Sequence, residues 1–330
     1  MMDSETKRRI IAGKVFLITG GTGSLGNKIV REIIKYSPKK VIILSRDEDK
    51  QYNMANELPS PLIQFELGDI RDEKRMREVT KGVDIIIHAA ALKHVPPSEK
   101  EPMEFIKTNI LGTNNIIESA IFNEVPVVIG VGTDKAVKPI NVYGMTKSLQ
   151  EKMMIAANKK NKTKFTCVRY GNVIGSRGSV IPFFKKKIMN NEVLPITNPN
   201  MTRFLLKLEE AINLIFHAID KGNGGEIFVK KMPACRMDDL ADAMGIALSN
   251  NPNYPKKVIG FRSGEKIHEI LVSEDEMRRS KELEDMFIIQ DYEHEINYST
   301  AEKIEEYGSY NTKRLNQEEI IKLLKEDGWA

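Results

Sequence analysis

The sequence predicts an α/β protein with a doubly wound parallel sheet and a smaller C-terminal α+β lobe. Three observations indicate this fold. Short apolar runs alternate with helical patterns through the first half of the chain, a glycine-rich turn follows the first run, and Tyr143 and Lys147 follow the fifth. Strands that alternate with helices imply right-handed crossovers and therefore a parallel sheet.

The elements of the first half follow one another as strand and helix. Apolar runs bounded by polar residues are typical of strands buried on both faces. We expect strands at 14–19, 41–44, 62–67, 83–88, 125–131 and 165–168. We expect helices at 27–36, 47–57, 71–80, 101–123 and 141–158.

The second half of the chain has a different residue pattern. After about residue 175, glycine, proline and short helical patterns dominate, and we expect helices at 180–189, 209–221 and 237–248. The predicted organisation is a nucleotide-binding domain over residues 1–175, to which some later segments return, and a substrate-binding lobe over 176–330.

Composition indicates a soluble, cytoplasmic protein. Apolar residues make up 41% of the 330, and 50 basic against 46 acidic residues leave a net charge of +4 without a long basic block, so nucleic-acid binding is not indicated. No apolar run reaches the roughly 18 residues of a membrane span, and the polar N-terminus does not resemble a signal peptide. Cys167 and Cys235 lie far apart, which fits a reducing compartment.

Residues 20–26 carry the spacing Gly-x-x-Gly-x-x-Gly between the first strand and the first helix. In this context the motif predicts a dinucleotide-binding turn, because the glycines let the backbone approach a pyrophosphate at the helix N-terminus. The alternative is a turn with only a structural role.

The residues that follow the second strand indicate which cofactor binds. An acidic residue there favours NAD, whereas the hydroxyl of Ser45 and the guanidinium of Arg46 suit the 2′-phosphate of NADP. We therefore expect NADP; Asp47 leaves NAD open, and Arg46 as a surface charge is the alternative. Asp69 closes the third strand and is expected either to accept from the adenine amine or to cap the next helix.

Tyr143 and Lys147 lie on one face of the helix that follows the fifth strand. A free Tyr has a pKa of about 10, so it is a poor base at neutral pH. We expect the Lys147 ammonium to lower the pKa of Tyr143 and to hold the nicotinamide ribose.

Thr133, Asp134 and Lys135 stand at the carboxyl end of the fifth strand, where open α/β sheets bind ligands. Thr133 is expected to bind a substrate hydroxyl, Asp134 to protonate a leaving hydroxyl, and Lys135 to take a carbon-bound proton acidified by a neighbouring ketone. A dehydrogenase needs only the Tyr and the Lys, so this additional acid and base suggest elimination of water. The alternative is a surface Asp–Lys pair.

A metal site is not expected. The five histidines lack ligand spacing with one another or with the cysteines; they are His88, His94, His217, His268 and His294. His88 ends an apolar strand and is expected to be a hydrogen-bonded core residue.

Nine strings in order resemble one family: residues 20–26, 45–48, 88–96, 133–136, 139–147, 169–182, 201–204, 225–229 and 264–266. They resemble the extended short-chain dehydrogenases/reductases, which have a Rossmann-like fold. Within that superfamily the match is closer to the short, soluble UDP-N-acetylglucosamine 4,6-dehydratases that invert carbon 5.

The resemblance implies a mechanism. Tyr143 takes the carbon-4 hydroxyl proton while hydride passes to the nicotinamide, and the new ketone acidifies carbon 5. Lys135 removes the carbon-5 proton, and Asp134 protonates the carbon-6 hydroxyl as it leaves. The hydride then returns to carbon 6, and reprotonation of carbon 5 on the opposite face gives the L-arabino product.

The resemblance also implies two sets of binding residues and a partner, UDP-N-acetylglucosamine. The cofactor set is Gly20, Thr22, Gly23, Ser24, Leu25, Gly26, Ser45, Arg46, Asp47, Lys50, Asp69, Ile70, Ala89, Ala90, Ala91, Lys93, Tyr143, Lys147, Tyr170, Asn172 and Val173. The substrate set is Lys93, Asn172, Val180, Thr197, Arg203, Arg262 and Glu265, with Arg262 and Lys266 as partners for the diphosphate.

Several alternatives stay open at this stage. A UDP-sugar 4-epimerase would need Tyr143 and Lys147 but not Asp134 and Lys135, and a retaining dehydratase would give the D-xylo product. A redox-sensing NADP-binding protein without turnover is a third alternative. Because relatives assemble as dimers or hexamers, we expect a homo-oligomer.

Overall fold

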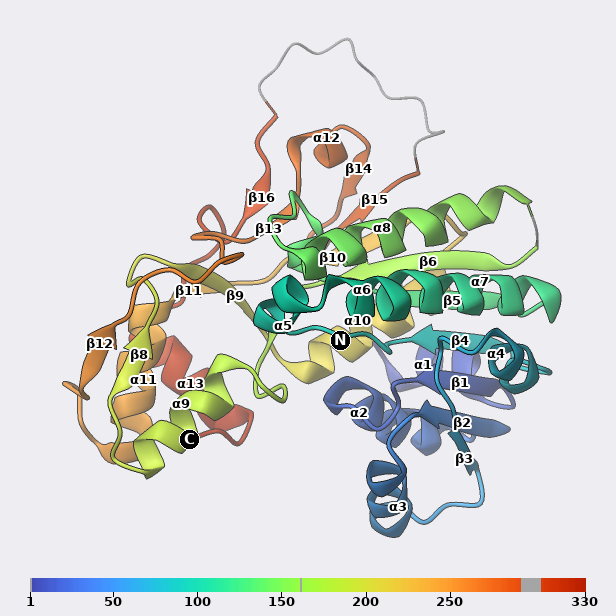
Figure 1. The fold of residues 1–330 in the computed structure, drawn as a ribbon, viewed down its shortest axis with the longest axis horizontal. Helices are drawn as coiled ribbons and strands as arrows, with labels where there is room; N and C mark the ends of the chain where they lie inside the picture. The colour runs from blue at the N-terminus through green and yellow to red at the C-terminus, as the bar shows by residue number, and fades with distance from the viewer. Residues whose placement is uncertain (1, 161, 292–303) are drawn as a thin grey trace.

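The computed structural model describes residues 2–160, 162–291 and 304–330. Within these residues the centre of the molecule is a sheet of nine strands in the order β14-β15-β10-β6-β5-β4-β1-β2-β3 (Figure 1). The strands from β3 to β10 pair in parallel, whereas β15 and β14 are antiparallel. The chain enters at β1 and winds outward in both directions, which confirms the predicted doubly wound, Rossmann-like fold.

The parallel strands are apolar because helices cover both faces of the sheet. Their bounds are β1 Val15–Thr19, β2 Lys40–Ser45, β3 Ile63–Leu67, β4 Ile85–His88, β5 Val127–Val131, β6 Lys164–Arg169 and β10 Ile227–Lys230. All five residues of β1 and all four of β4 are buried. The six strands expected from the sequence are present, with ends that differ by at most two residues.

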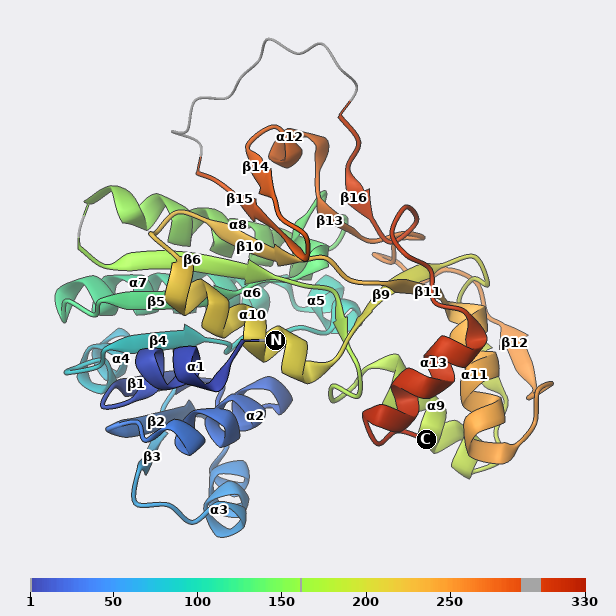
Figure 2. The ribbon, with the colours of Figure 1, turned by 180° about the vertical axis from the view of Figure 1, so that it is seen from behind.

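The helices form a layer on each side of the sheet. One layer holds α4 (Glu73–Val79), α7 (Gly112–Phe122) and α8 (Val142–Ala157) (Figure 1). The other holds α1 (Ser4–Ile11), α2 (Ser24–Ile33) and α10 (Leu208–Lys221) (Figure 2). The helix α3 (Glu48–Glu57) follows β2. The sequence patterns did not predict α1, whose first turn is capped by Asp3, which accepts from the Thr6 N–H at 2.8 Å.

The expectation of one helix over 101–123 is wrong. The chain forms α5 (Val95–Lys100), α6 (Pro102–Phe105), a π-helical segment Ile106–Leu111 and then α7. Pro102 starts a new helix because it cannot donate to α5. In the π-helical segment the Asn109 amide accepts from the Leu92 N–H at 2.8 Å and donates to its carbonyl at 2.9 Å. This irregular turn therefore holds the loop that follows β4.

A smaller lobe lies beside the carboxyl ends of the parallel strands (Figures 1 and 2). Its helices are α9 (Val180–Met189), α11 (Met237–Ser249) and α13 (Gln317–Glu326). Its strands are β7 (Asn172–Val173), β8 (Leu194–Ile196), β9 (Thr202–Leu206), β11 (Ala234–Arg236) and β12 (Lys256–Val258). Phe184, Leu240 and Ile320 belong to its own apolar core, separate from the core of the main sheet.

The last part of the chain connects both lobes. It contains β13 (Ile270–Val272), α12 (Glu274–Met277), β14 (Ser280–Glu282), β15 (Met286–Ile289) and β16 (Tyr307–Gly308). Three strands beyond residue 175, β10, β14 and β15, belong to the main sheet. The exact division into two domains stays a prediction. Across residues 2–160, 162–291 and 304–330, none of the helices is long and apolar enough to cross a bilayer.

Candidate active site

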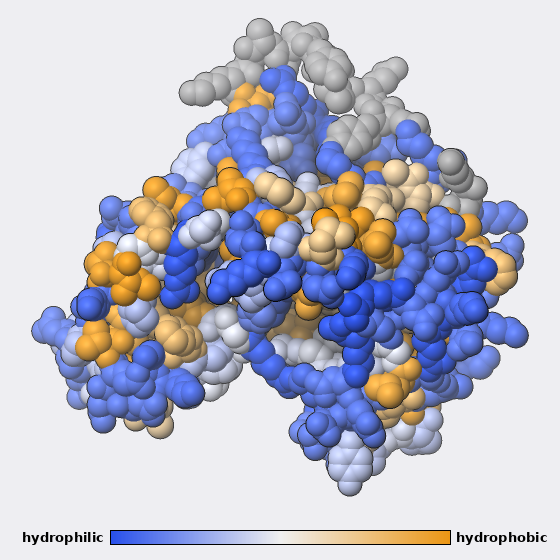
Figure 3. All heavy atoms as spheres, viewed as in Figure 1, coloured by the Kyte–Doolittle hydropathy of each residue, from blue (hydrophilic) through white to orange (hydrophobic). Residues whose placement is uncertain are grey.

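A cleft of about 1010 Å³ opens at the carboxyl ends of the parallel strands. The face of the molecule in Figure 3 carries hydrophilic side chains together with several hydrophobic patches, some of them over the smaller lobe. The lining of the cleft includes all five predicted catalytic residues and every predicted cofactor residue except Asp69. The structure therefore brings residues from six loops together at the edge where open α/β sheets bind ligands.

The glycine-rich turn has the shape that a diphosphate requires. Gly23 caps α2 without any side-chain hydrogen bond, so the N–H groups of the first turn face the cleft unblocked. A Cβ at Gly26 would lie 2.6 Å from the Gly20 carbonyl oxygen, and Gly20 itself has a φ of +68°. The turn therefore needs glycine at these two positions and leaves room for phosphate groups at the start of a helix, so it fits a dinucleotide.

The end of β2 lies beside the turn. The Ser45 hydroxyl hydrogen-bonds with the Thr22 hydroxyl at 2.8 Å. Asp47 caps α3, because its carboxylate accepts from the Lys50 N–H at 2.9 Å, and it also pairs with the Lys50 ammonium. That hydrogen-bonded pairing with Lys50 lowers the pKa of Asp47. The carboxylate of Asp47 is thus already occupied, while Ser45 and Lys50 line the cleft.

Asp69 lies just outside the lining of the cleft. Its carboxylate pairs with Arg71 at 2.7 Å and with Arg46 at 3.3 Å. The alternative that Asp69 caps the next helix is wrong, because Asp72 occupies the cap position of α4 and accepts from the Arg75 N–H at 3.1 Å. Arg46 therefore stays at the adenosine end of the cleft, held by an acidic neighbour.

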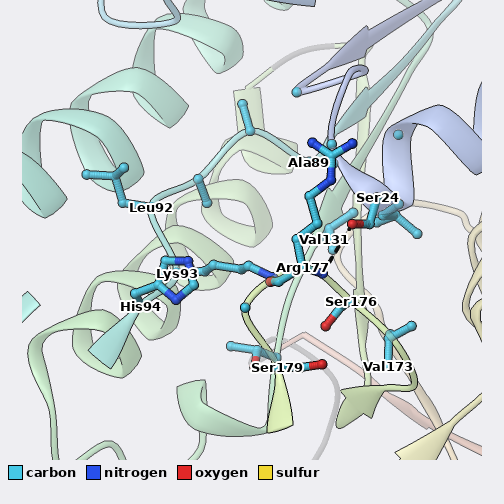
Figure 4. A pocket seen from close by; sticks show the side chains of 18 of the residues that line it. Ser24, Ala89, Leu92, Lys93, His94, Val131, Val173, Ser176, Arg177 and Ser179 are labelled. Carbon is cyan, nitrogen blue, oxygen red and sulfur yellow. Dashed lines mark hydrogen bonds between the residues drawn. The ribbon is translucent and has the colours of Figure 1, made fainter. Parts of the chain in front are cut away.

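A loop of residues 175–179 closes over the cleft, as Figure 4 shows. The Arg177 N–H donates to the Ser24 hydroxyl at 3.3 Å, and the Lys93 ammonium donates to the Arg177 carbonyl at 2.9 Å. Gly178 has a φ of +75°, and a Cβ there would lie 2.5 Å from the His94 ring. The loop thus joins the glycine-rich turn to the segment after β4. The patterns read from the sequence did not mark Arg177, although the glycines around it indicate a tight loop.

Asp134 is fully buried, so the alternative of a surface Asp–Lys pair is wrong. Its Oδ1 accepts from the Thr133 hydroxyl and from the Lys135 ammonium, each at 3.0 Å. Its Oδ2 is buried and has no hydrogen-bond partner within the part of the chain that the structure describes. Burial raises the pKa of Asp134; Lys135 opposes that rise, and the nearby carboxylate of Glu269 adds to it. Asp134 thus has the environment of a carboxylic acid that can donate a proton.

Tyr143 is buried beside this group, and burial raises its pKa to about 12. The cation that opposes this rise is Lys135, helped by a hydrogen bond with Thr133. The expectation that Lys147 lowers the pKa of Tyr143 is therefore wrong. Lys147 instead donates to the Val131 carbonyl at 2.7 Å and to the Gln150 side chain, and burial lowers its own pKa to about 8.

Glu269 was not predicted from the sequence. It lies directly before β13, and its carboxylate is 3.4 Å from the Lys135 ammonium. Lys135 is therefore shared between two buried carboxyl groups. Burial would lower the pKa of Lys135, but Asp134 and Glu269 raise it above its ordinary value. An acidic residue at the start of a short apolar run was the only sequence signal for Glu269.

The predicted substrate residues divide into two groups. Lys93 and Asn172 line the cleft, whereas Val180, Thr197, Arg203, Arg262 and Glu265 lie outside its lining. Val180 begins α9 and Thr197 follows β8, both in the smaller lobe.

The basic residues of this set differ in their surroundings. Arg203 donates to the carbonyls of Thr202, Lys266 and Ile267, and the Lys266 ammonium donates to the Val137 carbonyl at 2.6 Å. Their positive groups are thus occupied by the protein itself. The Arg262 side chain is 51% exposed, and its ion pair with Glu265 is long, at 4.0 Å. Its guanidinium can therefore reach an anionic ligand.

The histidines form no metal site among residues 2–160, 162–291 and 304–330, where no group of three or more His, Cys, Asp or Glu has the required arrangement. His294 lies outside the described residues. The prediction for His88 is confirmed, because its ring hydrogen-bonds with Thr19 at 2.8 Å and with Thr113 at 3.0 Å in the core.

Fold and site together define an enzyme of the extended short-chain dehydrogenase/reductase class, with a groove for a nicotinamide dinucleotide beside a Tyr–Lys pair. The chain belongs to the family described as "Polysaccharide biosynthesis protein", whose model matches residues 16–291.

Curated relatives of similar identity carry different names. A protein of Methanocaldococcus jannaschii named an uncharacterized membrane protein is 43% identical, over 95% of this chain and 96% of that one. The inverting UDP-N-acetylglucosamine 4,6-dehydratase of Campylobacter jejuni is 45% identical, over 84% and 82%. A UDP-glucose 4-epimerase of Rickettsia bellii is also 45% identical, over 94% and 95%.

Solved structures agree on the fold. Pen from Bacillus thuringiensis superposes with a TM-score of 0.89 at 35% identity, covering 96% of this chain and 99% of that one. The dTDP-glucose 4,6-dehydratase of Streptomyces venezuelae, solved with NAD bound, has a TM-score of 0.72 at 22% identity, covering 77% and 86%. A nicotinamide cofactor is thus supported by fold and groove.

Proposed function

We propose that this protein is an NADP-dependent UDP-N-acetylglucosamine 4,6-dehydratase that inverts carbon 5. The product is UDP-2-acetamido-2,6-dideoxy-β-L-arabino-hex-4-ulose. One observation carries the proposal: the buried Asp134 and the partly buried Lys135 form an acid–amine pair in the same cleft as Tyr143 and Lys147. The similarity to the C. jejuni dehydratase supports it.

The cofactor would lie along the glycine-rich turn, with the adenosine end at Ser45 and Arg46 and the ribose end at Lys147. When bound, an oxidised nicotinamide would supply the acceptor for a hydride from carbon 4 and the donor of that hydride to carbon 6. Tyr143 takes the proton of the carbon-4 hydroxyl, and both Lys135 and Thr133 act to lower the pKa of its phenol. NADP is proposed over NAD because Arg46 lies at the adenosine end, while the carboxylate of Asp47 is occupied by Lys50.

The Asp134–Lys135 pair carries one proton. In the ion pair this proton rests on Lys135, whose pKa the two carboxyl groups raise, and the elimination needs it on Asp134, beside a neutral Lys135 amine. Substrate that fills the cleft excludes water, and a neutral pair costs less to bury than two charges. Lys135 takes the carbon-5 proton, and Asp134 gives its proton to the carbon-6 hydroxyl, which leaves as water. On the substrate side, Lys93 and Asn172 line the cleft, and the exposed Arg262 is proposed to bind the UDP diphosphate.

A UDP-sugar 4-epimerase is the second candidate, because relatives of that name match as closely. Epimerisation would use Tyr143 and Lys147, but it includes no elimination of water and so would not need Asp134 and Lys135. A retaining dehydratase, with the D-xylo product, differs only in the face of reprotonation. The homo-oligomer, a dimer or hexamer, and the cytoplasmic location also stay predictions.

The test is to incubate the purified protein with UDP-N-acetylglucosamine and NADP and to record a mass spectrum of the sugar nucleotide. A product lighter by one water supports the proposal, and an unchanged mass with inversion at carbon 4 contradicts it. Lys135→Met should abolish the water loss and still bind the cofactor, whereas normal turnover of this variant contradicts the assignment of the base.

A further inference from the structure

Glu269 is held rigidly in the interior. Only 2% of the residue is exposed. Its N–H donates to the Ser309 hydroxyl at 2.9 Å, and its carbonyl accepts from the Ser309 N–H at 2.8 Å. Both hydrogen bonds fix the backbone from which the side chain extends to Lys135.

Three cations surround the Glu269 carboxylate. Oε1 lies 3.4 Å from the Lys135 ammonium and 3.7 Å from Arg203 Nε, and Oε2 lies 4.0 Å from the Lys266 ammonium. Arg203 and Lys266 are in turn held by backbone carbonyls. Burial opposes ionisation, but the three cations outweigh it and lower the pKa of Glu269. Glu269 is therefore a carboxylate in the folded protein.

Asp134 faces the same Lys135 ammonium, but its pKa is shifted in the opposite direction from that of Glu269. Its pKa is raised by burial and by the Glu269 carboxylate, against the attraction of Lys135. When the surroundings of two neighbouring carboxyl groups shift their pKa values in opposite directions, the two groups are suited to different roles. Asp134 is the member suited to give a proton in the elimination, and Glu269 is the member that stays charged.

We infer that Glu269 is a positioning residue for the dehydration: it holds the Lys135 amine in place and stabilises the ammonium that forms when Lys135 takes the carbon-5 proton. This inference rests on the proposed function. A fixed negative charge is most useful to a base at the moment when the base becomes positive, because the interaction is then stronger than in the ground state.

The protons and electrons of this step balance without another reactant. The carbon-5 to hydrogen bond breaks, and its proton forms the third N–H bond of Lys135. The electron pair left on carbon 5 forms the second bond of a double bond between carbons 5 and 6 as the carbon-6 to oxygen bond breaks. Asp134 gives its proton to the departing oxygen, so water leaves. Asp134 becomes a carboxylate, Lys135 an ammonium, and Glu269 keeps its charge throughout.

The experiment compares the unmodified holoenzyme with Glu269→Gln, which keeps the shape and removes the charge. Absorbance of the reduced nicotinamide reports carbon-4 oxidation, and mass spectrometry reports the release of water. We expect Glu269→Gln to keep carbon-4 oxidation and to release water about 10- to 100-fold more slowly, because an opposite charge shifts a pKa by about 1–3 units. With substrate deuterated at carbon 5, the isotope effect on water release should be larger for Glu269→Gln than for the unmodified enzyme. Glu269→Asp should recover part of the rate of water release.

Glu276→Gln is the control, since it removes a partly buried carboxylate that faces Arg169 rather than Lys135. Release of water by Glu269→Gln at the unmodified rate overturns the inference. So does an equal loss of both steps, with a lower melting temperature, in Glu269→Gln and Glu276→Gln. If the unmodified protein releases no water, the proposed function itself fails, and that outcome is distinct from the other two.

Discussion

At the scale of single residues, Lys135 links the two chemical steps of the proposed reaction. Its ammonium lies 3.0 Å from Asp134 and 3.4 Å from Glu269, and it is also the cation that opposes the rise in the pKa of Tyr143. One side chain therefore affects both the acid strength of the phenol and the elimination of water.

Replacement of Lys135 by Met should shift the pH dependence of carbon-4 oxidation to higher pH. Burial raises the pKa of Tyr143 most; Lys135 and Thr133 lower that pKa, and Asp134 and Glu151 raise it. Loss of the Lys135 charge leaves a weaker acid, so less phenolate is present at a given pH. Formation of reduced nicotinamide in single turnovers, measured across pH, checks this.

The control for that variant is Lys138→Met, on the same segment. Lys138 pairs with Glu274 and Glu306 at the surface and does not line the cleft. The Lys138→Met variant should therefore leave the pH profile of carbon-4 oxidation unchanged. An identical pH profile for Lys135→Met and the unmodified protein would contradict the role assigned to Lys135.

Arg46→Ala should weaken binding of NADP by about 10- to 100-fold and leave binding of NAD nearly unchanged, because a hydrogen bond to a charged group contributes about 1.5–3 kcal/mol. Titration calorimetry with both dinucleotides measures the ratio. An equal loss for NADP and NAD would show that Arg46 does not read the 2′-phosphate.

Most of the candidate site was predictable at this scale, because the residues follow strands that the apolar pattern marks. Asp134 and Tyr143 could be placed from the end of the fifth strand alone. Glu269 could not, since it reaches Lys135 from a segment more than a hundred positions further on, and no local pattern encodes such a contact. The surroundings of Lys147 were also unpredictable, because burial, rather than sequence spacing, sets its pKa.

At the scale of elements, Arg169 at the end of β6 ties α8 to α12. Its guanidinium bonds to Glu151 at 2.6 Å and to Glu276 at 2.9 Å, and it donates to the Leu271 carbonyl at 2.8 Å. Arg169 is 2% exposed, so these interactions are shielded from water.

Arg169→Met should destabilise the fold by about 3–5 kcal/mol, because it leaves the buried carboxylate of Glu151 and the partly buried carboxylate of Glu276 without their cation. Urea denaturation followed by circular dichroism measures the free energy of unfolding. Arg9→Met, which removes a largely exposed partner of Asp220, is the control and should cost about 1 kcal/mol or less. Equal losses for the two variants would contradict this account of the buried network.

The same network predicts a loss of stability in acid. Burial acts to raise the pKa of Glu276, but Arg169 outweighs burial and lowers this pKa to about 2, from an ordinary value of 4.5. A carboxyl group with a lowered folded-state pKa stabilises the fold above the unfolded value, and this contribution is lost as pH falls toward 2. Denaturation midpoints between pH 5 and about 2 should therefore fall less steeply in Glu276→Gln. Equal slopes in both proteins would contradict the assignment.

The sequence was sufficient for the six predicted strands of the main sheet, which are short, mostly apolar runs, and for most helices, which have an apolar period. It failed over 101–123, where Pro102 and a π-helical segment divide the expected helix. The π-helical turn depends on contacts of Asn109 with Leu92 and with Thr146, which are distant in sequence. Short strands such as β7 and β11 also carry too few residues to show a period.

At the scale of the whole molecule, the cleft lies at one edge of the sheet, beside a lobe with its own core. The predicted substrate residues Thr197 and Arg262 belong to segments outside the cleft lining, so the substrate would have to contact both lobes. The pairing of β10, β14 and β15 with the main sheet was not predictable in detail, because partners far apart in sequence are chosen by the packed core.

The most direct test of the account is proton NMR of the product formed from UDP-N-acetylglucosamine and NADP in deuterated water. The account predicts a 4-keto-6-deoxy sugar nucleotide with one deuterium at carbon 5 and coupling constants of the L-arabino ring. A product that keeps its carbon-6 hydroxyl and has no deuterium at carbon 5 would contradict the claim that Asp134 and Lys135 eliminate water.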